Sequence, residues 1–219
     1  MALTAGLAGF TNPASATVLN VAIDTSLLEG TQGQLAFDLT DGDSALNNTV
    51  TITNFVTDGT LNSPVVMEGG VSGALPSAVS ISDTNFFNEL LQPFIFATFI
   101  SFTLTLTDNY DTNGSLPDQF ALYMVNFDTP IPKPLFTTSD PTGNGALFAV
   151  DLGVNDGLPS YQPTTSPAAS WSVTHAPTVP EPGASILFGT GLLALAGCRR
   201  RRQALECPAD LAVSQPSFT

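Results

Sequence analysis

Short runs in which apolar and polar residues alternate recur along most of the chain. Every second residue is apolar in Ser101–Thr107, and threonine or serine occupies the positions between. A period of two places the apolar side chains on one face of an extended strand and the hydroxyls on the other. Thr49–Thr53 repeats the pattern. The side chains expected to point inward from these two segments are Phe102, Leu104, Leu106, Val50 and Ile52.

Gly, Pro, Asn and Asp separate the runs, which is typical of antiparallel strands joined by turns. The pattern therefore predicts an all-β fold, an antiparallel β-sandwich or jelly-roll-like domain. The expected strands are Val18–Asp24, Gln34–Leu39, Thr49–Phe55, Val65–Met67, Ala78–Ser82, Ala97–Thr107, Phe120–Phe127, Leu135–Thr138, Ala146–Leu152 and Ser170–Thr174.

Asn85–Leu91 is the one segment of this region that favours a helix. Asp83 or Thr84 stands where an N-cap would lie, and Pro93 stands where a helix would end. We expect one or two helical turns here, closing one end of the sandwich.

The chain is acidic but poor in charge. Its 219 residues allow one domain with tails, and only 11% of them are charged, against roughly 25% in an average domain. Between Thr17 and Pro180 there are 16 acidic residues and a single basic one, Lys133. Such a surface repels phosphate backbones, which argues against nucleic-acid binding.

The first 16 residues are apolar and small, and Ala14-Ser15-Ala16 has the form that signal peptidase accepts. No basic residue precedes the apolar stretch, so we interpret 1–16 as a truncated signal peptide; a hydrophobic N-terminal strand is the alternative. The β-sandwich domain is then expected over 17–175.

The end of the chain combines three features in a fixed order. A proline-rich linker, 176–183, contains Pro180-Glu181-Pro182, and an apolar stretch from Ala184 leads into four arginines that end at residue 202. This order resembles the PEP-CTERM sorting signal of secreted proteins from Gram-negative bacteria that make exopolysaccharide. The residues that carry the resemblance are Val179, Pro180, Glu181, Pro182, Gly183, Arg199, Arg200, Arg201 and Arg202.

Physical reasoning about the C-terminal segment agrees with that resemblance. Fifteen apolar residues make a helix of about 22 Å, shorter than the roughly 30 Å hydrocarbon core, so 184–202 is expected to be a short, marginal transmembrane helix. Arginines on its far side place that side in the cytoplasm and the acidic body outside. Residues 203–219 have no periodic pattern and are expected to be a disordered tail.

The resemblance implies a partner, a location and a role. The partner would be an exosortase, a membrane peptidase that processes near the Pro-Glu-Pro motif, and insertion in the inner membrane would be transient. The mature protein would reach the cell envelope, the surface or the extracellular matrix. We expect a structural or adhesive role in an exopolysaccharide or biofilm matrix. The alternatives are a carbohydrate-binding module, with or without Ca²⁺ dependence, and, less favoured, a secreted hydrolase.

Two acidic loops offer oxygen ligands for Ca²⁺, and no other cofactor is expected. Carboxylates on flexible loops suit this ion, although neither loop has the EF-hand spacing, and Asp, Asn and Gly are also the ordinary residues of turns. Plain turns are the favoured interpretation of both loops. The candidate ligands are Asp38, Asp41 and Asp43 in the first loop, and Asp108, Asp111 and Asn113 in the second.

No catalytic residue set can be assembled from the sequence, so we do not expect an enzyme. The body has one histidine, His175, and both cysteines, Cys198 and Cys207, lie in the C-terminal segment. A glycan-binding surface needs exposed aromatic rings. Tyr110 and Tyr161 are the candidates for stacking on a sugar, whereas Trp171 alternates with serines and is expected to pack in the core or at an edge.

Overall fold

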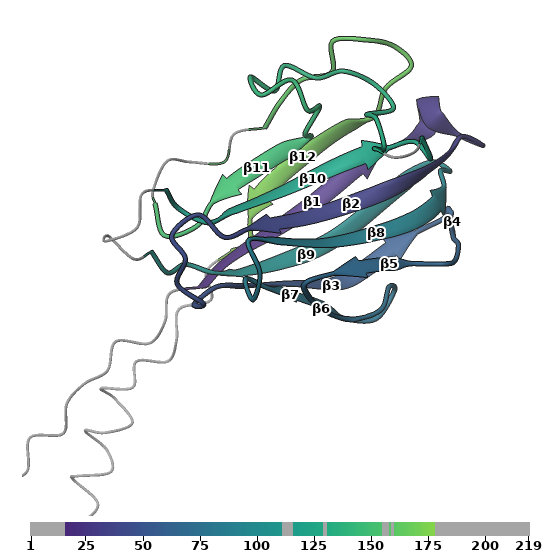
Figure 1. Ribbon diagram of the computed structural model, residues 1–219. Helices are drawn as coiled ribbons and strands as arrows, with labels where there is room; N and C mark the ends of the chain where they lie inside the picture. The colour runs from purple at the N-terminus through teal and green to yellow at the C-terminus, as the bar shows by residue number, and fades with distance from the viewer. Residues whose placement is uncertain (1–15, 111–115, 129–130, 155–157, 159, 178–219) are drawn as a thin grey trace, which may run out of the picture. The chain divides into compact units, whose positions relative to one another are not determined.

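A computed structural model describes residues 16–110, 116–128, 131–154, 158 and 160–177 (Figure 1). Two antiparallel sheets of six strands lie face to face, and the one helical element in this part of the chain is a 3-10 turn, Ser26–Leu28. The all-β sandwich predicted from the alternating pattern is thus confirmed. Chain contacts group the residues up to Ala176 into one compact unit.

The first sheet has the strand order β12-β1-β9-β3-β7-β6. All its neighbouring strands run antiparallel, and β1 pairs with β9 along its whole length. The bounds are Ser170–His175 for β12, Ala16–Asp24 for β1, Phe99–Thr107 for β9, Thr49–Thr57 for β3, Val79–Ser82 for β7 and Gly70–Gly73 for β6.

The second sheet has the order β11-β10-β2-β8-β4, and β5 also pairs with β8. The strands β2 and β8 form its centre and pair over nine residues each. The bounds are Phe148–Asp151 for β11, Gln119–Val125 for β10, Gln32–Thr40 for β2, Phe87–Ile95 for β8, Thr60–Leu61 for β4 and Val66–Glu68 for β5.

The core lies between the sheets and is built from the inward positions of both. Phe37 of the second sheet meets Phe102 of the first edge to face, with ring centroids 5.7 Å apart. Side chains from the two inner faces interdigitate to join such layers, and aromatic pairs add to the apolar contribution. The inward residues expected from the pattern, Phe102, Leu104, Leu106, Val50 and Ile52, are all buried.

The helix expected at Asn85–Leu91 does not form, because this segment enters β8. The side chains of Asn88 and Leu90 face the core, whereas Phe87 and Glu89 alternate with them on the other face. Asp83 caps no helix; its Oδ2 accepts the backbone N–H groups of Asn47 and Asn48. The pairing with β2 overrides the local helix signals, and Pro93 lies within the strand.

The strand expected at Leu135–Thr138 is also absent. This segment makes single bridges at its borders, Val125 to Pro134 and Thr138 to Pro163. The short strands β4 and β6 were missed, and each has at most four residues.

Several predictions fall outside the described residues: the signal peptide 1–16 except Ala16, the sorting signal from Val179 to Arg202, and the tail 203–219. Within the part of the chain that the structure does describe, no helix is long and apolar enough to cross a membrane.

Candidate functional site

Two carboxyl groups face each other on the outer surface of the second sheet. Asp38 on β2 lies directly opposite Glu89 on β8, and Glu68 on β5 follows as the next cross-strand neighbour of Glu89. Directly opposite residues of antiparallel strands share a face, and their Cβ atoms are about 5 Å apart. The register of three strands therefore gathers three acidic side chains in one row.

The Asp38 and Glu89 side chains interact with each other, and both resist ionisation. Burial, reinforced by the negative charge of Glu89, raises the pKa of Asp38 to about 8. Burial likewise raises the pKa of Glu89, and the charge of Glu68 adds to this effect, while the hydrogen bond with Asp38 opposes it. Asp38 Oδ1 is buried and receives no hydrogen bond from any N–H or O–H group in the described part of the chain. Two neighbouring carboxyl groups in a partly buried site favour a state in which one of them keeps its proton.

This pair lines a cavity of about 470 Å³. Tyr123, on β10, shares the cavity; burial, followed by the nearby charge of Asp38, raises the pKa of its phenol to about 12. None of the described residues lining the cavity is basic. The lining residues are Ala36, Asp38, Thr40, Phe87, Glu89, Leu91, Gln119, Ala121, Tyr123, Val125, Ile131, Pro132, Pro134, Gly143 and Asn144.

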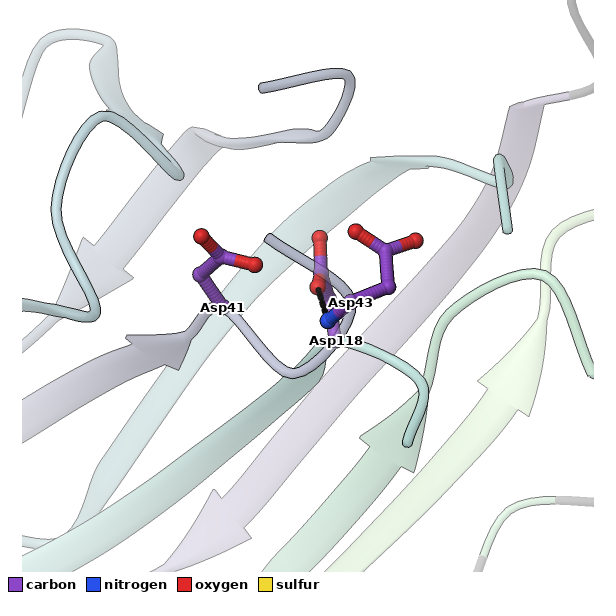
Figure 2. Close-up of side chains that lie close together, drawn as sticks. All are labelled: Asp41, Asp43 and Asp118. Carbon is purple, nitrogen blue, oxygen red and sulfur yellow. Dashed lines mark hydrogen bonds between the residues drawn. The ribbon is translucent and has the colours of Figure 1, made fainter. Parts of the chain in front are cut away.

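A second acidic group lies at one end of the sandwich, where Figure 2 shows Asp41, Asp43 and Asp118 close together. One carboxylate oxygen of each lies within 4.8 Å of the others. Asp41 and Asp43 follow β2, and Asp118 immediately precedes β10, so the antiparallel pairing of these strands brings them together. Three hard oxygen ligands of this kind are part of what Ca²⁺ requires.

Backbone and side-chain groups of the chain already donate hydrogen bonds to the carboxylate of Asp118. Asp118 is fully buried; its Oδ1 accepts the N–H of Gly42 at 2.8 Å and that of Asp43 at 3.4 Å. Its Oδ2 accepts the side-chain amide of Asn48 at 2.8 Å. Burial raises the pKa of Asp41, the hydrogen bond from the Ser44 N–H opposes this, and the charges of Asp118 and Asp43 add to the rise.

A glycine lets this loop close. A Cβ on Gly42 would lie 2.1 Å from the carbonyl oxygen of Pro117, so only glycine permits the backbone after β2 to approach the residues before β10. The acidic cluster therefore holds two chain segments together at the end of the sandwich.

The structure separates residues that the sequence grouped as calcium ligands. Asp38 is directed to the outer face of the second sheet and is not part of the cluster formed by Asp41 and Asp43. In the second loop Asp108 accepts the backbone N–H of Gly153 at 2.6 Å. Asp111 and Asn113 lie outside the described residues.

The aromatic candidates lie in partly buried positions. Tyr110 is half-buried and packs against Gly153. A Cβ added at Gly153 would lie 2.4 Å from the Cβ of Tyr110 and would clash with it. Tyr161 is half-buried, and burial, reinforced by the charges of Asp140 and Asp151, raises its pKa. Trp171 stacks on Phe136 at the β12 edge, in agreement with its expected packing role.

Sequence reasoning missed Glu89, Asp118 and Tyr123 as members of these sites. Glu89 stood inside the segment expected to be helical, and the other two were assigned no role in a site. The signal that identifies them is the strand register, which becomes available only once the partner strands are known.

The outer face of the first sheet is different in chemistry. Among the described residues of its six strands Asp24 is the one acidic residue, and none is Lys or Arg. Hydroxyl side chains cover most of it, for example in the cross-strand row formed by Ser72, Ser80, Thr51 and Thr105. A shallow hollow of about 710 Å³ lies over β12, β1 and β9, and Phe99 reaches it from β9.

Comparison with known proteins identifies one region of the chain. A protein-family model described as the PEP-CTERM protein-sorting motif matches residues 178–202. Searches of curated proteins and of solved structures found no match. The matched segment coincides with the proline, apolar and arginine elements recognised in the sequence. The chain thus carries a PEP-CTERM sorting motif, the mark of an exported protein that an exosortase processes at the membrane and that is sorted to the cell surface.

Proposed function

We propose that the mature protein is a non-catalytic structural or adhesive component of an extracellular matrix, and that it contacts exopolysaccharide through the outer face of its first sheet. The observation that carries this proposal is the hydroxyl-rich surface of six strands, whose described residues include one carboxylate, Asp24, on a body that is otherwise strongly acidic. The matrix role itself is an inference from the sorting motif and from this surface.

Charge distribution supports a neutral polymer as the partner. The 16 acidic residues between Thr17 and Pro180 repel anionic polymers over most of the surface. The first sheet presents Ser and Thr side chains at the strand spacing of about 4.8 Å, and these groups both donate and accept hydrogen bonds. Away from Asp24, a hydroxyl-bearing chain can replace water on such a face without desolvating a charge.

The hollow on this face adds a place for one stretch of polymer. Its polar lining includes Ser101 from β9, Ser172 from β12 and the Asp24 carboxylate at the end of β1, and the Phe99 ring is 40% exposed at its border. An exposed aromatic ring beside hydroxyl groups suits the apolar face and the polar edges of a sugar.

Binding is favoured over catalysis by the arrangement of the acidic groups. Glycosidases hold two carboxyl groups about 5–10 Å apart with the substrate between them. Asp38 and Glu89 instead hydrogen-bond to each other. His175 is exposed at the end of β12 and has no hydrogen bond from its side chain among those between described residues.

Polymer retention tests the proposal. Full-length protein in mild detergent is run on gels that contain a neutral polysaccharide or an acidic one. We expect retention on the neutral gel only, and a loss of about fivefold or more in affinity for Phe99→Ala. Phe86→Ala is the matched control, because Phe86 is 74% exposed and lies outside the hollow. Equal migration in both gels and a plain gel would refute the proposed contact.

The export route has a separate test. Mass spectrometry of the mature protein from its native host is expected to find the C-terminus near Pro180-Glu181-Pro182, with Arg199–Arg202 removed. Recovery of the intact chain, including Thr219, as a soluble cytosolic species would contradict processing and remove the basis for a matrix role.

A further inference from the structure

We propose that the cavity on the outer face of the second sheet binds the ammonium group of a cationic amino sugar between Asp38, Glu89 and Tyr123. This site lies on the sheet opposite the hydroxyl-rich face. The inference takes only the saccharide class of the ligand from the proposed matrix function, while the requirement for a positive charge comes from the cavity itself.

The cavity concentrates negative charge without a protein cation to balance it. The acidic groups nearest to the ligand position are Asp38 and Glu89, and Glu68 lies beyond Glu89 on β5. Lys133 belongs to the neighbouring loop, but it pairs with Asp128 at 3.4 Å and does not line the cavity. Burial and the like charges oppose ionisation of such a carboxyl pair, and a cation placed beside it would offset both effects.

The other titratable groups around the pair are also neutral or acidic. From β10 comes the Tyr123 phenol, and beyond it lie Asp140 and Tyr161, whose charges act on that phenol. From β11 comes Asp151, which accepts a hydrogen bond from the Gln119 amide at 2.7 Å. All these groups favour a cation over an anion at this position.

The size and lining of the cavity fit a sugar ring that bears the amine. A volume of about 470 Å³ lies within the usual range for small-ligand sites. Phe87 and Tyr123 contribute aromatic rings, which attract cations and pack against apolar ring faces. Thr40, Gln119 and Asn144 contribute polar side chains that can pair with sugar hydroxyls. A bare divalent metal is a poorer fit, because two carboxylates are far fewer than the six to eight oxygens that Ca²⁺ takes.

Binding of an ammonium group has a thermodynamic signature. While the raised pKa values keep a proton on the Asp38–Glu89 pair, the bound ammonium group takes its place, so the ionised pair is favoured and the proton is released to solvent. Affinity therefore rises with pH while the free pair still holds its proton. Release of one proton corresponds to about a tenfold gain in affinity per pH unit.

Calorimetry of the full-length protein in mild detergent tests the proposal. The probes are glucosamine oligomers, their N-acetylated counterparts, and a lysine-containing peptide of similar charge. We expect the glucosamine oligomers to bind, with about one proton released per site in buffers of different ionisation enthalpy, and with an affinity about tenfold higher at pH 6.5 than at pH 5.5. The N-acetylated oligomers and the peptide are expected to bind at least tenfold more weakly.

Three variants make the assignment specific. Asp38→Asn and Glu89→Gln keep the size of each side chain and are expected to abolish both proton release and the pH dependence. Glu29→Gln is the matched control, since Glu29 is exposed and lies outside the cavity. Thermal unfolding of each variant confirms that it is folded before its binding is compared.

The outcomes separate this proposal from the proposed matrix contact. Equal binding of glucosamine and N-acetylglucosamine oligomers, or binding of glucosamine oligomers that Asp38→Asn leaves unchanged, would overturn the amine site. Equal binding of the peptide would overturn the saccharide assignment. Retention on neutral polysaccharide depends on Phe99 and the opposite sheet, so it is expected to survive Asp38→Asn whichever result is found.

Discussion

The two outer faces of the sandwich are built from the same kind of strand but differ in what they expose. The strands of the first sheet contain one carboxylate, Asp24, which lies at the end of β1. The strands of the second sheet contain four acidic residues, Asp38, Glu68, Glu89 and Asp151, and two of them, Asp38 and Glu89, line a cavity and have raised pKa values.

This contrast also appears in the acidic groups themselves. Hydrogen bonds from Ser26 lower the pKa of Asp24 and so favour the charged form of this exposed carboxylate. Burial raises the pKa of Asp38, so the second sheet holds a carboxyl group that opposes ionisation. This difference is consistent with the two proposals, because a carboxyl group kept at a cost in stability is typical of a binding site and a surface with one carboxylate suits broad, weak contacts.

The largest expected effect concerns the core that both faces share. Phe37→Ala removes a fully buried ring that contacts Phe102 across the sandwich, and we expect the free energy of unfolding to fall by about 3–5 kcal/mol. Urea denaturation measures the loss. Phe99→Ala on the outer face is the control, and its effect is expected to stay below about 1 kcal/mol. Similar losses for both variants would contradict the assigned inner and outer faces.

The second effect is a gain in stability with a defined pH dependence. The pKa of Asp38 is higher in the folded protein than its ordinary value of 3.8. The protonated side chain therefore contributes its full stabilisation of the folded protein below about pH 4, and this stabilisation is lost as the pH rises towards 8. Asp38→Asn is expected to raise the free energy of unfolding at pH 8 by about 1–3 kcal/mol and to change it little at pH 4. Denaturant melts at both values measure this.

Asp24→Asn is the comparison on the first sheet and has the opposite sign. A lowered pKa stabilises the folded protein above about pH 4, and that contribution disappears as the pH falls through the folded value. Removing this exposed carboxylate is therefore expected to bring no gain at pH 8. A gain as large as that from Asp38→Asn would mean that net charge, rather than the buried pair, governs the effect.

A smaller effect is expected from the hydroxyl-rich face. Thr105→Val replaces a hydroxyl with a methyl group of the same shape in the middle of β9. Because the position is on the outer face of a strand, we expect the free energy of unfolding to change by less than about 0.5 kcal/mol. Affinity electrophoresis is expected to show weaker retention on neutral polysaccharide. Unchanged retention would limit the contact to the hollow around Phe99.

The smallest effect is expected from calcium. The oxygens of Asp118 already accept hydrogen bonds from Gly42, Asp43 and Asn48, so we propose that the acidic cluster holds loops rather than an ion. Addition of 1 mM Ca²⁺ is expected to raise Tm by no more than about 1 °C in thermal unfolding. A rise of several degrees that Asp41→Asn abolishes would instead establish a calcium site that joins the β2 and β10 ends.

Alternation was the reliable signal, and local cap signals were the unreliable one. The period of two in Ser101–Thr107 and Thr49–Thr53 identified strands and their buried faces, because burial of one face must follow the pleat. The same reasoning failed at Asn85–Leu91, where a cap residue and a later proline favoured a helix. The pairing with β2 decided this segment, and that pairing joins residues about 50 positions apart.

The sequence by itself determined the class of fold and the presence of a sorting motif for export. Strand periodicity is local, and the sorting motif is contiguous from 178 to 202, so both can be read without a partner strand. Only the tertiary structure decided which acidic residues meet. Asp38 was grouped with Asp41 and Asp43 by proximity in sequence. Asp38 lies within β2 and meets Glu89 across the sheet, whereas Asp41 and Asp43 lie in the loop after β2 and meet Asp118 before β10. The physical reason is that a site in a sandwich is set by the register between strands, and register depends on how the whole core packs.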